Sequence, residues 1–98
     1  MKLTERQKKH LRGLAHALKP VIALGDKGLT DGFLNELDST LEHHELIKVK
    51  VKTGDRDSRD TLIAEIAEKT SAVLVSRIGN IATLYRARAR KPGITLPT

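Results

Sequence analysis

The fold is decided by residues 21–51, which read VIALGDKGLTDGFLNELDSTLEHHELIKVKV. The short apolar run at 21–24 predicts a buried strand. Residues 30–44 predict a helix that Thr30 can cap, and its apolar residues recur at helical spacing, at Phe33, Leu34, Leu37 and Leu41. Residues 46–52 alternate between apolar and lysine side chains, which predicts a strand with one face on the core. A strand–helix–strand unit of this kind favours parallel pairing of its two strands.

The flanking sequence completes the pattern. Before the unit, Thr4 and Gln7 form a capping box, and an amphipathic helix of about fifteen residues is expected to end before Pro20. After it, a third helix is expected, capped by Asp57 or Ser58, and strands at 73–78 and 81–86 are joined by a Gly79-Asn80 hairpin signal. The predicted fold is α/β, an N-terminal helix followed by β-α-β-α-β-β in a four-stranded mixed sheet. Helices are expected on one face, because covering both would bury Lys48 and Lys50 at high cost.

The chain has 98 residues, which is room for one hydrophobic core. We assign residues 1–86 to a single domain that includes the basic N-terminal helix. Residues 87–98 form a basic C-terminal tail with two prolines and no clear period.

The net charge of +6 is concentrated at the two ends of the chain. Residues 1–19 carry +5 and residues 86–98 carry +4, whereas residues 20–85 carry −3. Charge gathered in this way favours a polyanionic partner, most often nucleic acid, with an acidic membrane surface as the rival interpretation. No run approaches the length of a membrane span, there is no cysteine, and the N-terminus does not resemble a signal peptide. We therefore expect a cytoplasmic protein without a membrane partner.

Gly25-Asp26-Lys27-Gly28 lies between the first strand and the second helix. Two glycines allow a sharp turn and a close approach of backbone to a ligand. The helix that follows directs unpaired N–H groups toward the loop, and Lys27 adds a cation. The pattern fits a phosphate-binding loop, and it equally fits a tight turn without a ligand.

Catalytic and metal sites are not indicated. His43 and His44 are adjacent, so on a helix they diverge and do not easily share one ion. Asp55, Asp57 and Asp60 are interleaved with arginines, which favours a solvated, salt-bridged helix cap over an acid–base pair. We expect no enzyme activity, no metal, no cofactor and no small-molecule substrate.

The interface expected from these patterns contacts phosphates rather than bases. Phe33 is expected in the core, and Tyr85 could either stack on a base or be a half-buried edge residue, so the chain lacks the aromatic platform of many RNA-binding folds. The lysine-faced strand could also be an ordinary solvated face. The candidate nucleic-acid-binding residues are Gly25, Asp26, Lys27, Gly28, Lys8, Lys9, Arg12, Lys48, Lys50, Arg86 and Arg88.

Three stretches resemble the CRM-domain family in its bacterial single-domain, YhbY-type form. They are KPVIALGDKGLT (19–30), LEHHELIKVK (41–50) and IGNIATLYR (78–86). The resemblance implies an RNA-binding α/β fold related to the C-terminal domain of translation initiation factor 3. It also implies that Gly25–Gly28 is the signature GxxG loop.

The resemblance further implies a role in ribosome biogenesis. The expected partner is RNA, namely large-subunit rRNA in a pre-ribosomal particle, bound by a monomer. The alternative is a protein-interaction module that docks on a ribosomal protein, with RNA contact incidental. A small hydrolase built on the Asp55, Asp57 and Asp60 cluster is the third hypothesis.

Overall fold

The computed structural model describes residues 2–25, 28–52 and 55–98 of the chain. Its helices and strands follow one another as α1 (Glu5–Ala15), β1 (Pro20–Leu24), α2 (Asp31–His44), β2 (Leu46–Val51), α3 (Arg56–Thr70), β3 (Val73–Ile78) and β4 (Ile81–Tyr85). This order confirms the predicted N-terminal helix and the β-α-β-α-β-β succession.

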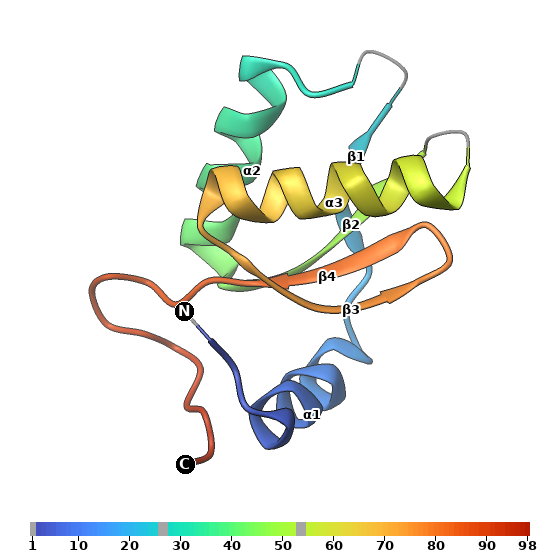
Figure 1. Ribbon diagram of the computed structural model, residues 1–98. Helices are drawn as coiled ribbons and strands as arrows, with labels where there is room; N and C mark the ends of the chain where they lie inside the picture. The colour runs from blue at the N-terminus through green and yellow to red at the C-terminus, as the bar shows by residue number, and fades with distance from the viewer. Residues whose placement is uncertain (1, 26–27, 53–54) are drawn as a thin grey trace.

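The four strands form one mixed sheet in the order β1-β2-β4-β3 (Figure 1). β1 and β2 pair in parallel, as the strand–helix–strand unit predicts, and the other two pairs are antiparallel. β4 is the last strand in the chain but lies between β2 and β3. Residues of β4 therefore have strand neighbours on both sides.

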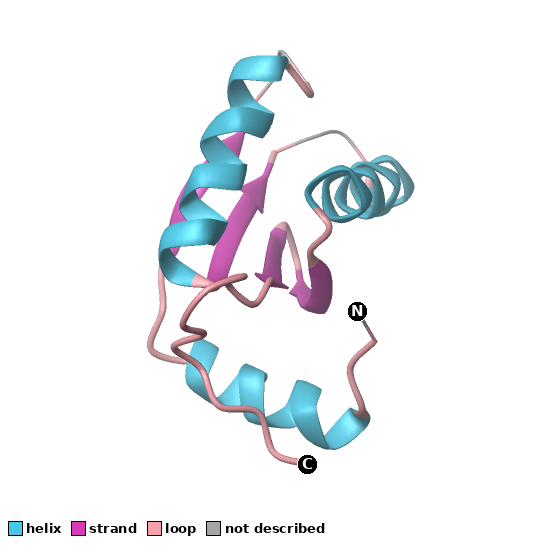
Figure 2. Cartoon of the chain, turned by 90° about the vertical axis from the view of Figure 1, so that its left-hand side faces the viewer, coloured by secondary structure: helices cyan, strands magenta, loops and turns pink. Residues whose placement is uncertain are grey.

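α2 and α3 cover one face of the sheet, as predicted, but the opposite face is only partly open, because α1 packs against one end of it (Figure 2). β2 shows how the two faces differ. Ile47, Val49 and Val51 are at most 2% exposed, while Lys48 and Lys50 point to the α1 side and are half-buried. The main core lies between the sheet and the two helices and consists of Ile22, Leu24, Leu37, Leu41, Ile47, Val49, Val51, Ile63, Ile66, Ala82 and Leu84.

A second, smaller core lies between α1 and the sheet. Leu11 and Ala15 of α1 pack there with Tyr85, which is 1% exposed. Ile94 and Leu96 of the C-terminal tail pack against the same cluster. The side chain of Gln7 donates a hydrogen bond to the carbonyl of Pro97 at 3.0 Å. The basic tail predicted at 87–98 thus packs against α1 and the sheet.

α1 is shorter than the sequence pattern predicts, because the helix ends at Ala15 instead of continuing to Leu18. The His16 N–H bonds to the carbonyl of Gly13 at 3.3 Å, which tightens the last turn. Leu14 and Leu18 are 44% and 36% exposed, so they are not core residues. The chain must leave the helix early because Pro20 already begins β1.

The start of α1 follows the predicted capping chemistry, whereas the cap predicted for α3 is wrong. Thr4 accepts from Gln7 N at 3.1 Å while the Gln7 side chain accepts from Thr4 N at 3.0 Å, which completes the capping box. α3 begins at Arg56, and Asp55 rather than Asp57 or Ser58 caps it, because the Asp55 carboxylate accepts from Ser58 N at 2.8 Å. This backbone hydrogen bond lowers the pKa of the Asp55 carboxyl below its usual range.

Candidate nucleic-acid interface

The described residues of the glycine loop form a tight connection from strand to helix. The Gly28 N–H bonds to the carbonyl of Gly25 at 3.1 Å, so the two glycines lie close together. Gly28 has φ +70°, in the left-handed region that glycine adopts without steric cost. Thr30 then caps α2 by accepting from Phe33 N at 3.1 Å. Gly28 therefore meets a requirement of the backbone, and contact of the loop with phosphate stays a prediction.

The predicted contacts of Asp26 and Lys27 lie outside the described residues. The strand that leads into the loop is described. β1 and β2 are parallel, and Ala23 pairs with Lys50 while Leu24 pairs with Val51. Gly25 follows β1 directly, so Lys50 lies on the neighbouring strand at the end of the sheet where the glycine loop begins.

Lys48 and Lys50 extend from this end of the sheet toward α1. They project from the same face of β2, about 7 Å apart along the strand. Neither lysine forms an ion pair with any residue that the structure describes. Their positive charge is therefore available to a ligand on the part of the sheet that α1 leaves uncovered. We call this part the open face, and it carries Lys48, Lys50, Ser76, Ile78 and Thr83.

The α1 cations differ in their surroundings. Lys8 lies 3.8 Å from Glu5 in an exposed pair, which contributes little to stability. Lys9 and Arg12 are exposed and unpaired within the described ranges. Arg12 borders the open face together with Lys48. The fold thus brings Arg12 and Lys48 together although they are far apart in the sequence.

Arg86 is placed differently from the other predicted cations. Its guanidinium is 3.4 Å or closer to the carboxylates of Asp38 and Glu42, and it donates to the carbonyls of Thr70 and Asp38. The side chain is 18% exposed. Its charge is compensated inside the fold, so Arg86 joins α2 to the end of α3, and its predicted contact with nucleic acid stays untested.

Arg88 also binds the end of α2. Its guanidinium donates to the carbonyls of Glu42 at 2.9 Å and His43 at 2.6 Å. Cations at a helix C-terminus stabilise the unpaired carbonyls there. Arg86 and Arg88 are therefore grouped at the C-terminal end of α2, while the glycine loop precedes the N-terminal end of the same helix (Figure 1).

The histidine and aspartate clusters have structural partners. The rings of His43 and His44 lie edge to face at 4.8 Å. Asp60 is paired with Arg77 at 2.6 Å and lies 4.0 Å from Arg56. Within the described ranges, no three His, Asp or Glu side chains are grouped as metal ligands. The ion pairs of Asp60 and the capping role of Asp55 fit the salt-bridged cap predicted for this segment.

Both predictions for Tyr85, base stacking and a half-buried place at the edge of the sheet, are wrong. At 1% exposed it is a core residue and can neither stack on a base nor be a half-buried edge residue. The reason is the central position of β4, which places Tyr85 beneath α1 and the tail. Burial raises the pKa of the Tyr85 phenol, and the Glu45 carboxylate raises it further.

Tyr85 provides a direct test of this packing, because it is the only tyrosine and the chain has no tryptophan. The raised pKa means that stability is full below about pH 10 and is lost as the pH rises from there through the folded-state value. Ultraviolet absorbance of the phenolate should show ionisation at a higher pH in the native protein than in urea. Tyr85→Phe should remove the signal, and coincident native and unfolded titrations would contradict the buried position.

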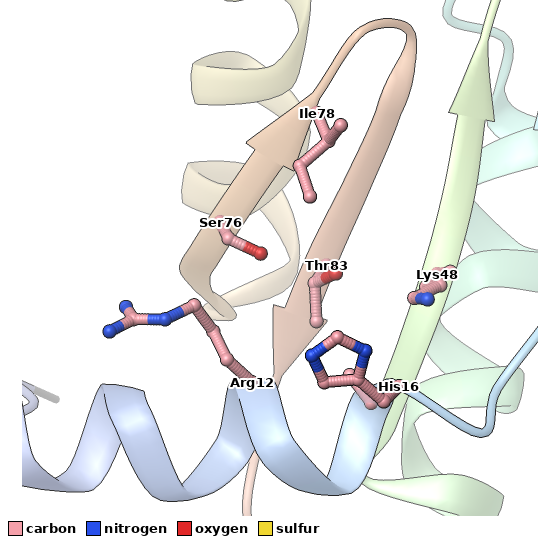
Figure 3. A pocket seen from close by; sticks show the side chains of 7 residues that line it. Arg12, His16, Lys48, Ser76, Ile78 and Thr83 are labelled. Carbon is pink, nitrogen blue, oxygen red and sulfur yellow. The ribbon is translucent and has the colours of Figure 1, made fainter.

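A pocket on the open face contains polar residues that the sequence patterns did not single out. The hollow of about 100 Å³ is lined by Arg12, Ala15, His16, Lys48, Ser76, Ile78 and Thr83 (Figure 3). Thr83 pairs across the sheet with Lys48 on one side and with Ser76 on the other. The alternation along 81–85 places Thr83 on the face of the sheet that carries the lysines. Lys48, Thr83 and Ser76 become neighbours, however, only because β4 lies between β2 and β3, which no local pattern predicts.

Comparison with known proteins identifies the fold. Residues 3–86 match the sequence profile of the CRS1/YhbY (CRM) domain. The chain belongs to the CRM-domain family. A Haemophilus influenzae protein named as an RNA-binding protein is 50% identical to this CRM domain over 84 residues, or 86% of this chain and 85% of the relative. A Pseudomonas aeruginosa relative, named "Probable RNA-binding protein", is 44% identical over 88% of this chain and 83% of its own length.

A solved structure shows the same architecture. The solution structure of Staphylococcus aureus SAV1595, a candidate RNA-binding protein, superposes with a TM-score of 0.84 at 36% identity. The match covers 98% of this chain and all of the other chain. The sequence profile ends at residue 86, so the C-terminal tail lies beyond it although the tail packs on the domain.

Proposed function

We propose that this CRM domain binds RNA, specifically large-subunit rRNA in precursors of the ribosome, and assists their assembly in the cytoplasm. The observation that carries the proposal is the open face with Arg12 at its border. Its cations have no partner among the described residues, and the face extends to the glycine loop. The names of the relatives support RNA as the partner.

The geometry favours recognition of the RNA backbone. Lys48, Lys50 and Arg12 offer point charges and a guanidinium fork, which suit phosphate oxygens. At the glycine loop, backbone N–H groups and Lys27 would contact further phosphates. Because the only tyrosine is buried, base stacking on aromatic side chains would contribute little.

Binding to protein-free large-subunit rRNA transcripts tests the proposal. The wild-type chain should bind them more tightly than small-subunit transcripts of matched length, and the affinity should fall steeply with salt through counterion release. Lys27→Ala should weaken binding to every transcript and flatten the salt slope by about one. The measurement is fluorescence anisotropy across a salt series.

The alternative predicts another outcome. A module that docks on a ribosomal protein would ignore protein-free rRNA and keep its ribosomal contact after nuclease treatment. That pair of results would contradict RNA binding as the function. An unchanged salt slope for Lys27→Ala would remove the glycine loop from the interface while leaving RNA binding intact.

A further inference from the structure

The pocket on the open face gathers five polar side chains from four elements and an adjoining turn. Arg12 comes from α1, His16 from the turn that directly follows it, Lys48 from β2, Ser76 from β3 and Thr83 from β4. In the part of the chain that the structure describes, none of these five side chains forms a hydrogen bond or an ion pair. Thr83 is buried, Lys48 and Ser76 are half-buried, and Arg12 and His16 are exposed, so the group combines a buried hydroxyl with side chains that solvent or a ligand can reach.

Thr83 is the clearest of these groups. The residue is only 4% exposed, yet its side chain lines the pocket and has no partner within the described ranges. A threonine hydroxyl both donates and accepts hydrogen bonds, so in this position it can satisfy a ligand hydroxyl. Ser76 lies directly across the sheet and adds a second hydroxyl to the same floor.

The cations stand on both sides of this floor. Figure 3 shows Arg12 on one side of Thr83 and Lys48 on the other, with the His16 ring beside Thr83. Ala15 and Ile78 supply the apolar part of the lining. The order across the pocket is therefore cation, hydroxyls, cation. The RNA backbone repeats in the same order, as phosphate, ribose with its 2′-hydroxyl, and phosphate.

We propose that this pocket binds one ribose of an RNA strand together with its flanking phosphates. Thr83 and Ser76 contact the 2′-hydroxyl, and Arg12 and Lys48 contact the two phosphates. The imidazole of His16 lies against the sugar or hydrogen-bonds to it. A protein distinguishes RNA from DNA through the 2′-hydroxyl, so the pocket makes this CRM domain selective for ribose.

The proposal deepens the proposed function and rests on it, because it specifies how the same face selects RNA over DNA. The hollow suits a sugar edge better than a whole nucleotide. Its volume of about 100 Å³ is well below the roughly 300 Å³ at which pockets for drug-sized ligands begin. A base attached to the bound ribose would therefore extend outward, toward solvent or toward Ile78, which is 79% exposed.

The test compares an RNA hairpin with a single-stranded tail and its deoxyribose counterpart of identical sequence. Thr83→Val with Ser76→Ala keeps the shape of the strands and removes both hydroxyls. This variant should lose about ten-fold in RNA affinity and less than about two-fold in DNA affinity. Arg12→Ala should weaken both by roughly six-fold, because phosphates are common to both.

Matched controls lie outside the pocket. Thr61→Val with Ser39→Ala removes two hydroxyls from exposed helix positions, and Arg6→Ala removes an exposed α1 cation. These variants should leave the ratio of RNA to DNA affinity unchanged. Equal losses for RNA and DNA in Thr83→Val/Ser76→Ala would overturn the proposal, as would a wild-type chain that does not distinguish the two.

A second measurement separates this pocket from the proposed function. Ribose 5-phosphate, followed by NMR, should shift the amide signals of Ser76 and Thr83 in the wild type more than 2-deoxyribose 5-phosphate does. The shifts should disappear in Thr83→Val/Ser76→Ala, whose remaining spectrum reports whether it folds. Shifts without any binding to rRNA would support the pocket and contradict the proposed function. Binding to rRNA with no difference between the two sugars would support the proposed function and contradict the ribose pocket.

Discussion

Replacing Glu45 with glutamine should lower the free energy of unfolding by about 2–4 kcal/mol, because it breaks a buried charge-assisted contact. Glu45 is 1% exposed and lies just after α2. Its two carboxylate oxygens accept from the backbone N–H groups of Arg88 at 2.9 Å and Gly93 at 2.6 Å. In Glu45→Gln, one of these N–H groups faces an amide NH₂ and loses its acceptor.

The size of this effect follows from where the contact lies. Small domains are stable by about 5–15 kcal/mol in total, so the loss would be a large fraction. The contact also fixes the tail that carries Ile94 and Leu96 to the second core. We therefore expect the amides of residues 87–98 to lose hydrogen-exchange protection before the main core does.

Urea unfolding followed by circular dichroism measures the loss, and native-state hydrogen exchange measures the release of the tail. Glu42→Gln is the matched control, because its carboxylate is 58% exposed and lies 3.4 Å from Arg86. An exposed pair of this kind should contribute less than about 1 kcal/mol. Equal destabilisation by the two substitutions would contradict the role assigned to Glu45.

Gly93 explains why the tail can approach so closely. A Cβ at this position would lie 3.0 Å from Glu45 Oε1 and 3.4 Å from the Arg88 guanidinium. A side chain at this position would therefore push the Glu45 carboxylate away by a few tenths of an ångström, and glycine avoids this shift. This packing has no local signature, because Glu45 and Gly93 are 48 positions apart.

The elements themselves could be predicted because their signals are local. Alternation in 46–51, the Gly79-Asn80 turn and the Thr4 and Thr30 caps each act within a few residues, and the structure contains all of them. The parallel pairing of β1 with β2 follows from the strand–helix–strand unit. These features are consequences of side-chain periodicity and backbone capping.

The arrangement around α1 could not be predicted in the same way. It depends on contacts between segments that are far apart in the sequence, such as Leu11 with Tyr85. The pocket shares this origin, because Arg12 and Thr83 meet only when β4 is central and α1 lies across the sheet. In the sequence, a threonine or serine that contacts a ligand looks the same as one that faces solvent, because both occupy the same positions of an alternating strand.

Reversing the charge of Lys48 and Lys50 together should reduce rRNA affinity by at least about 40-fold at about 0.1 M salt. Each phosphate contact contributes roughly 0.7–0.9 to the slope of log affinity against log salt, and its loss costs about six-fold at this salt concentration. The losses of affinity from the two contacts multiply, and the new carboxylates of Lys48→Glu/Lys50→Glu repel the phosphates nearby. The salt slope should fall by about 1.4–1.8.

The matched control places the same charge change on the opposite side of the sheet. Arg56 and Lys69 lie on α3, where each is paired only with an acidic residue of the same helix within the described ranges. Arg56→Glu/Lys69→Glu changes the net charge equally but should alter affinity only through long-range repulsion, which salt screens within about 10 Å at 0.1 M. Because the two variants differ in position and not in charge, equal losses would mean that net charge alone attracts the RNA and that the open face is not its binding surface.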